Sequence, residues 1–166
     1  AIDRADFDEE VRRRGGGISG AWIDESLTAA AEALSVASAD DLEFLTLTIN
    51  GTSRSLTINA RRGDQPDFID SVTVREGDVV AVTPIQDADE LPLDELLIDV
   101  DDTPIDDVET LDDRALVEFG EPDGFVTIIS VSLDGTEAST TVQLSSARRT
   151  GSVVFDAAGN TVEVDR

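Results

Sequence analysis

The side chains of this chain that could do chemistry are almost all carboxylates. Asp and Glu number 37 against 12 basic residues, all of them Arg, and the sequence contains no His, Cys or Lys. These absences exclude imidazole bases, thiol nucleophiles, disulfides, thiolate metal sites and Schiff-base chemistry. Carboxylate chemistry, oxygen-ligated cations and binding through surfaces remain.

The acidic segment around residue 100 is the best candidate for a cation site. Asp99, Asp101 and Asp102 offer oxygens at closely spaced positions, which predicts a Ca²⁺ or Mg²⁺ site. The segment lacks the Gly and the distal Glu of a calcium-binding helix-loop-helix, so a solvated linker is the alternative. Paired carboxylates for glycoside hydrolysis can be drawn almost anywhere in so acidic a chain. We therefore expect no enzyme and no obligatory cofactor.

The charge predicts where such a protein can work. The net charge is -25 at pH 7, and repulsion of this size destabilises a small globule in dilute buffer. At molar salt the Debye length falls to about 3 Å, which screens the repulsion. Abundant Asp with Arg in place of Lys resembles haloarchaeal proteins, so we expect a halophilic source.

Residues 1–20 are predicted to form an extended N-terminal arm. The arm holds Phe7, the run Arg12, Arg13 and Arg14, and three glycines after it. With Trp22 at the entrance to the following helix, these side chains are the candidate assembly residues, since guanidinium groups pair well with carboxylates of a neighbouring subunit. A solvated arm is the alternative, and the negative charge disfavours a nucleic-acid partner.

Two β-units are expected after the arm. Residues 21–85 combine a helix over 24–38, with Asp24 as N-cap, and a first unit of alternating strands. Residues 86–114 form an acidic connector, and residues 115–166 a second unit. In the first hairpin, a loop from Asn50 to Ser53 would set Leu47 opposite Leu56.

The two units resemble each other. Both contain a Thr-rich strand, a turn of Asn50-Gly51-Thr52 or Asp134-Gly135-Thr136, a returning strand, an Ala-Arg-Arg sequence and a further hairpin. This pattern is compatible with an internal duplication, and convergence of Thr-rich hairpins on similar patterns explains it at least as well. The Asn50 turn is also an N-glycosylation sequon, and Arg62-Gly63-Asp64 matches a cell-adhesion tripeptide, which chance explains in a chain of this composition.

The predicted fold is therefore mainly β: antiparallel sandwich or barrel-like units with one short N-terminal helix and an extended arm. The predicted function is that of a non-catalytic structural subunit, a haloarchaeal virus virion component (capsid, decoration, turret or tail). Its expected partners are copies of itself and other assembly proteins, with no membrane span. The alternative is an intracellular haloarchaeal adaptor or ligand-binding β-module. With no signal peptide visible, the expected location is the virion or the cytoplasm of a halophile.

Overall fold

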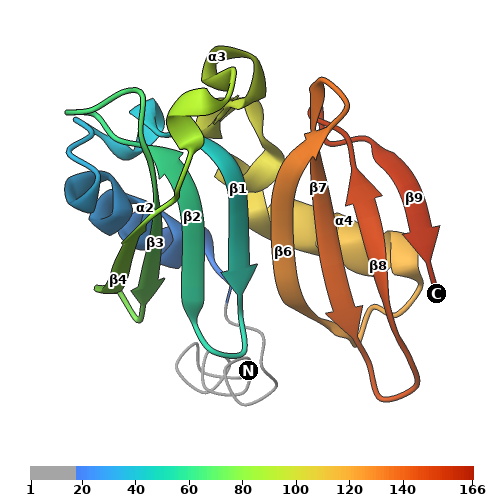
Figure 1. The fold of residues 1–166 in the computed structure, drawn as a ribbon. Coiled ribbons are helices and arrows are strands. Elements are labelled where there is room, and N and C mark those ends of the chain that lie inside the picture. Colours follow the sequence, from blue (N-terminus) through green and yellow to red (C-terminus); the bar gives the residue numbers. More distant parts are fainter. Residues whose placement is uncertain (1–17) are drawn as a thin grey trace.

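A single antiparallel sheet forms the body of the protein. The structure is a computed structural model that describes residues 18–166, and it contains nine strands in one sheet (Figure 1). The fold is therefore mainly β, as the alternation of apolar and polar residues predicts.

The elements follow one another in two similar series. The first comprises α2 (Gly20–Ala33), β1 (Glu43–Asn50), β2 (Ser55–Arg61), β3 (Ile69–Arg75) and β4 (Asp78–Pro84). A connection follows with α3 (Leu93–Leu96) and β5 (Ile98–Asp99), together with short 3-10 turns. The second comprises α4 (Val108–Phe119), β6 (Phe125–Asp134), β7 (Glu137–Ser145), β8 (Thr150–Phe155) and β9 (Thr161–Asp165).

The strand order joins both series into one layer. It runs β4-β3-β2-β1-β6-β7-β8-β9, with β5 attached to β1, so β4 and β9 are its edges. The expected sandwich or barrel-like units are thus halves of one open sheet. They join because β1 pairs with β6, an arrangement that buries the inner edge of each half.

The junction has the register of an internal two-fold axis. Leu47 pairs with Val131, and they lie 84 positions apart (131 minus 47), as do the turn residues Asn50 and Asp134 (134 minus 50). Leu47 and Val131 therefore occupy equivalent positions in the two halves, and they pair with each other. This geometry, and the helix plus four strands in each half, agree with an internal duplication.

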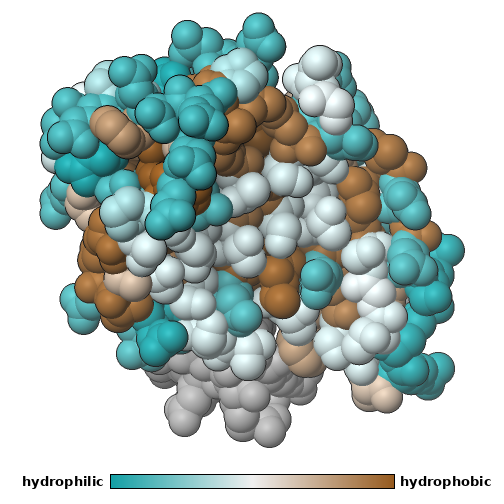
Figure 2. Space-filling model, viewed as in Figure 1, coloured by the Kyte–Doolittle hydropathy of each residue, from teal (hydrophilic) through white to brown (hydrophobic). Residues whose placement is uncertain are grey.

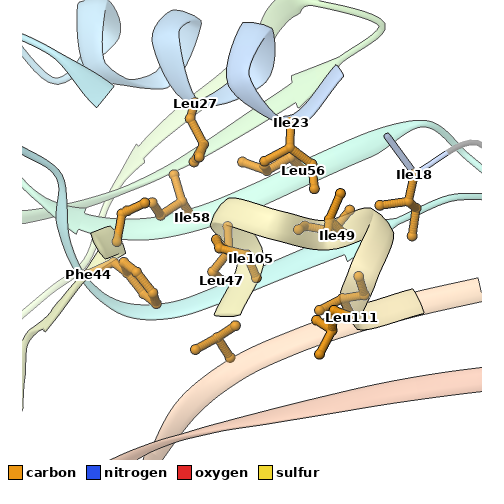
Figure 3. Packing of buried hydrophobic residues seen from close by; sticks show 14 of the residues in the cluster. Ile18, Ile23, Leu27, Phe44, Leu47, Ile49, Leu56, Ile58, Ile105 and Leu111 are labelled. Carbon is orange, nitrogen blue, oxygen red and sulfur yellow. The ribbon is translucent and has the colours of Figure 1, made fainter. Parts of the chain in front are cut away.

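Two helices cover one face of the sheet. In Figure 1 both α2 and α4 lie behind the strands, α2 against the first half and α4 against the second. Figure 3 shows Ile23 and Leu27 of α2 directed at Leu56 and Ile58 of β2. All four side chains are buried, so apolar burial holds the helix on the sheet.

The first helix begins earlier than predicted. Its N-cap is Ser19, whose Oγ accepts a hydrogen bond from the backbone N–H of Trp22 at 3.3 Å, and the helix runs from Gly20 rather than from Asp24. Trp22 is therefore the third helical residue. The predicted apolar stripe of Leu27, Ala30 and Ala31 is buried as expected.

The helix α4 was not predicted. It lies across the boundary at residue 114 that we expected between the acidic connector and the second unit. Val108, Leu111, Ala115 and Phe119 are buried along one side, a helical spacing that the many intervening acids obscure. Its core-facing side packs on β6, β7, β8 and β9.

The first hairpin differs from its predicted register, and β1 also contains a bulge. The pairing shifts between Phe44 and Thr46, which moves Leu45 off the face that carries Leu47. Leu47 pairs with Ile58 rather than with Leu56. The loop begins one residue later than expected because Asn50 ends β1, and its Oδ1 accepts hydrogen bonds from Thr52 N at 3.0 Å and Ser53 N at 3.1 Å.

The other face of the sheet is covered at one end only. Ile69, Ala88 and Leu93 form a small apolar cluster where the connection after β4 folds over the first half, and Figure 1 shows α3 on this side. Within residues 18–166, no helix or loop covers the rest of that face. Among the described helices, none is long and apolar enough to cross a bilayer.

Candidate interaction surface

The open side of the sheet carries three rows of side chains across β3, β2, β1, β6, β7 and β8. Each row follows directly opposed residues on neighbouring strands, and none of its members is buried. We call these rows the hydroxyl face. They are Ser71-Asn59-Thr46-Ser132-Ser139, Thr73-Thr57-Thr48-Ser130-Thr141-Val154 and Ser55-Asn50-Ile128-Gln143-Ser152.

The hydroxyl face contains no charged residue, although the chain has a net charge of -25. Figure 2 shows this side of the molecule: most of the middle is pale, and strongly hydrophilic residues gather at its upper and right-hand rims. The charges begin where the rows end, with Arg75 on β3 and with Glu163 and Asp165 on β9.

Strand propensity explains the threonines of this face but not the absence of acids. Thr fits a half-buried pleated surface, and opposed Thr residues stabilise a sheet. Yet β9 continues the same rows with Glu163 and Asp165, so carboxylates are compatible with this side of the sheet. The absence of acids from the three rows therefore needs a reason other than strand formation, although Asp134 of β6 and Glu137 of β7 lie on the same side just beyond them.

Two of the three rows show the same pattern in both halves of the molecule, whereas the equivalents of Asn50 and Ser55 are the acids Asp134 and Glu137. In those two rows, repeat-equivalent positions carry small polar side chains in each half. The equivalent pairs are Thr46 and Ser130, Thr48 and Ser132, Thr57 and Ser139, and Asn59 and Thr141.

Hydrogen bonds order part of the face. Asn59 Nδ2 donates to Thr46 Oγ1 at 2.8 Å, and the hydroxyls of Thr57 and Thr73 lie 3.1 Å apart. These contacts link neighbouring strands. They hold the side chains in fixed positions, which lowers the entropy cost of binding a partner.

The two edges of the sheet are less suited to docking. Both edge strands contain a bulge, at Val80 in β4 and at Val162 in β9, and both valines are exposed. Bulges at sheet edges are a common device against strand addition. Residues of β4 such as Val79 and Val82 are exposed beside the bulge, but the interrupted backbone ladder disfavours a continuous pairing.

A hollow of about 550 Å³ lies beside the predicted metal residues. Asp99, Asp101 and Asp102 line it with Glu137 of β7. Within residues 18–166, no group of three or more acidic side chains is placed to hold a metal ion. The predicted Ca²⁺ or Mg²⁺ site therefore gains no geometric support from the described residues.

The predicted assembly arm lies mostly outside the described residues. Phe7, Arg12, Arg13 and Arg14 are in that part of the chain. Trp22 is only 5 % exposed and belongs to the core. The guanidinium of Arg54 lies 5.6 Å from its ring centre, a cation–π distance that fixes α2 to the β1–β2 loop.

The tripeptide Arg62-Gly63-Asp64 is part of the fold. Arg62 forms ion pairs with Asp64 at 2.9 Å and with the buried Asp70 at 2.8 Å. These hydrogen bonds raise the pKa of Arg62 and lower the pKa of Asp64. Gly63 lies against the carbonyl of Ser35, so the tripeptide joins the β2–β3 loop to the end of α2.

Comparison with known proteins adds a likeness of fold. No protein-family model matches the chain, and no curated protein matches it significantly. A crystallised candidate lipoprotein of Clostridium difficile 630 is similar in structure, with a TM-score of 0.52 over 75 % of this chain and 82 % of that one. The two sequences are 12 % identical, so the likeness concerns the arrangement of the chain alone.

Proposed function

We propose that this protein is a non-catalytic structural subunit of a protein assembly from a halophilic source, a virion component of a haloarchaeal virus such as a capsid, decoration, turret or tail protein. The uncharged hydroxyl face carries the assembly part of the proposal. The composition supports the halophilic part, because a net charge of -25 suits a protein that folds at molar salt.

The physical argument concerns the cost of docking. A partner that lands on carboxylates must strip their hydration, and it meets repulsion if it is itself acidic. Hydroxyl and amide groups are cheaper to desolvate, and they find new hydrogen bonds across an interface. The hydroxyl face is therefore the broad surface of this molecule on which another acidic protein can dock at least cost.

Expression of matched variants in a haloarchaeal host tests the proposal. Thr48→Glu places a carboxylate in the middle of the hydroxyl face, and Thr28→Glu places the same group on the exposed side of α2. We expect wild type and Thr28→Glu to elute in large assemblies at molar KCl, and Thr48→Glu to elute largely as the free 17.7 kDa chain.

Two outcomes would count against it. If wild type elutes only as the free chain, the protein is no assembly subunit. If Thr48→Glu assembles as well as wild type, the hydroxyl face is not the docking surface. Finding the chain in purified virus particles tests the virion part separately.

The alternative, an intracellular adaptor or ligand-binding β-module, would use the hollow beside Asp99. Its volume of about 550 Å³ lies within the usual range of small-ligand sites, roughly 300–1,000 Å³. A saturable rise of the melting temperature with added calcium would favour this alternative over the assembly proposal.

A further inference from the structure

We infer that the partner on the hydroxyl face is a second copy of this chain, docked face to face about a two-fold axis. This inference rests on the proposed function and names the occupant of its surface. It follows from the chemistry of the side chains, the size of the face and the charges around it.

The face is complementary to itself in hydrogen bonding. A hydroxyl both donates and accepts, and so do the amides of Asn59 and Gln143, whereas a carboxylate only accepts and a guanidinium only donates. A two-fold axis sets the face against its own copy, so every group meets a group of the same set. Groups that both donate and accept can satisfy one another in any such pairing, and Ser, Thr, Asn and Gln supply nearly all of the three rows.

Other classes of partner fit less well. The three rows contain no aromatic side chain for stacking on a sugar or a base, and no Arg for phosphate. They hold only two larger aliphatic residues, Ile128 and Val154, which is too few for a lipid surface. A protein with the same kind of surface is the remaining match.

The area suits a weak, reversible dimer. The sixteen positions of the three rows, about 4.8 Å apart between strands and about 6.8 Å apart along them, cover roughly 500 Å². Two such faces bury roughly 1,000 Å², the lower limit for a specific interface. Two sheets of the same twist pack in this way at an angle of about 30°. Because the remaining surface is strongly acidic, dimerisation should strengthen as salt rises.

Charge exchange at one position tests the inference with the full chain purified alone. We expect wild type to dimerise in sedimentation at molar KCl, and Thr48→Glu and Thr48→Arg to be at least tenfold weaker when each is alone. A mixture of the two should dimerise again, because Thr48 lies near the centre of the three rows, where a two-fold axis through the face brings opposite charges at this position close together. The pair Thr28→Glu and Thr28→Arg on α2 is the control and should behave as wild type.

Each possible result of these measurements supports or overturns the face-to-face dimer. Wild type that stays monomeric at millimolar concentration overturns the inference, and so does a mixture that fails to recover. If the purified chain is monomeric while the host still yields large assemblies that Thr48→Glu abolishes, the second copy is wrong but the proposed function stands. If the host also yields only the free chain, the proposed function fails with it.

Discussion

Replacing Asp112 should make the protein more resistant to alkaline pH. Asp112 lies on α4, where its Oδ1 is buried and has no hydrogen-bond partner among residues 18–166. Burial, together with repulsion from Glu109 and Asp113, raises the pKa of Asp112 to about 8. A carboxyl group in this position favours its protonated form in the folded state.

The sign of the effect follows from proton linkage. Between about pH 4 and pH 8, Asp112 is protonated in the folded protein but ionised in the unfolded chain. The free energy of unfolding therefore falls by about 1.4 kcal/mol for each unit that the pH rises in this range. The cost is absent below about pH 4 and complete above about pH 8. Asp112→Asn removes this dependence while keeping the size of the side chain.

Denaturant unfolding at molar KCl measures the difference. From about pH 5.5 to about pH 8.5, the free energy of unfolding of Asp112→Asn relative to wild type should rise by up to about 3 kcal/mol. Glu118→Gln, at an exposed position of the same helix, should show little change. If the free energy of unfolding of Asp112→Asn relative to wild type does not change over this pH range, the reasoning is refuted. An advantage of the variant that grows as the pH falls would also refute it, because it would require a lowered pKa of Asp112.

Three further predictions concern the fold. Gly63→Ala should lower the free energy of unfolding by about 1–3 kcal/mol, because a Cβ there would lie 2.0 Å from the Ser35 carbonyl oxygen. In denaturant unfolding, the control Gln65→Ala in the same exposed loop should leave that free energy unchanged. Leu111→Ala should cost about 2–5 kcal/mol, since Leu111 is 3 % exposed beneath α4, whereas Val117→Ala on the exposed side of the helix should change stability by less than about 0.5 kcal/mol. Equal losses of stability for Leu111→Ala and Val117→Ala would contradict the packing of α4 with Leu111 toward the core. The melting temperature should rise steeply with KCl up to molar concentration as repulsion is screened, and a melting temperature independent of salt would contradict the halophilic interpretation.

The first hairpin illustrates what local pattern can predict. Alternation of Leu47 and Ile49 with Thr48 is enough to predict a strand with two different sides, and Asn50-Gly51 predicts the turn that follows. The predicted register was wrong because the loop is placed one residue later than expected: Asn50 still pairs with Ser55, and its side chain accepts hydrogen bonds from the loop. An Asn-Gly pair marks a turn but does not by itself fix which residue is the last of the strand.

The helix α4 was missed although its pattern is local. Val108, Leu111, Ala115 and Phe119 have helical spacing, but the surrounding acids led us to expect a solvated connector. In a halophilic protein the outer side of every helix is acidic, so high charge is a poor sign of a linker. The buried side could have been predicted from spacing alone.

The sequence by itself determined the mainly β fold, the repeated Thr-rich hairpins and an acidic exterior, because these follow from side-chain type and periodicity. Only the tertiary structure decided that the two units share one sheet and that helices cover one side of it. An alternating strand has two sides, and nothing in its own pattern says which neighbouring strands will extend a polar row. The pairing of β1 with β6 aligns the polar sides of both halves into one uncharged face, because strands in one sheet share their inward and outward directions.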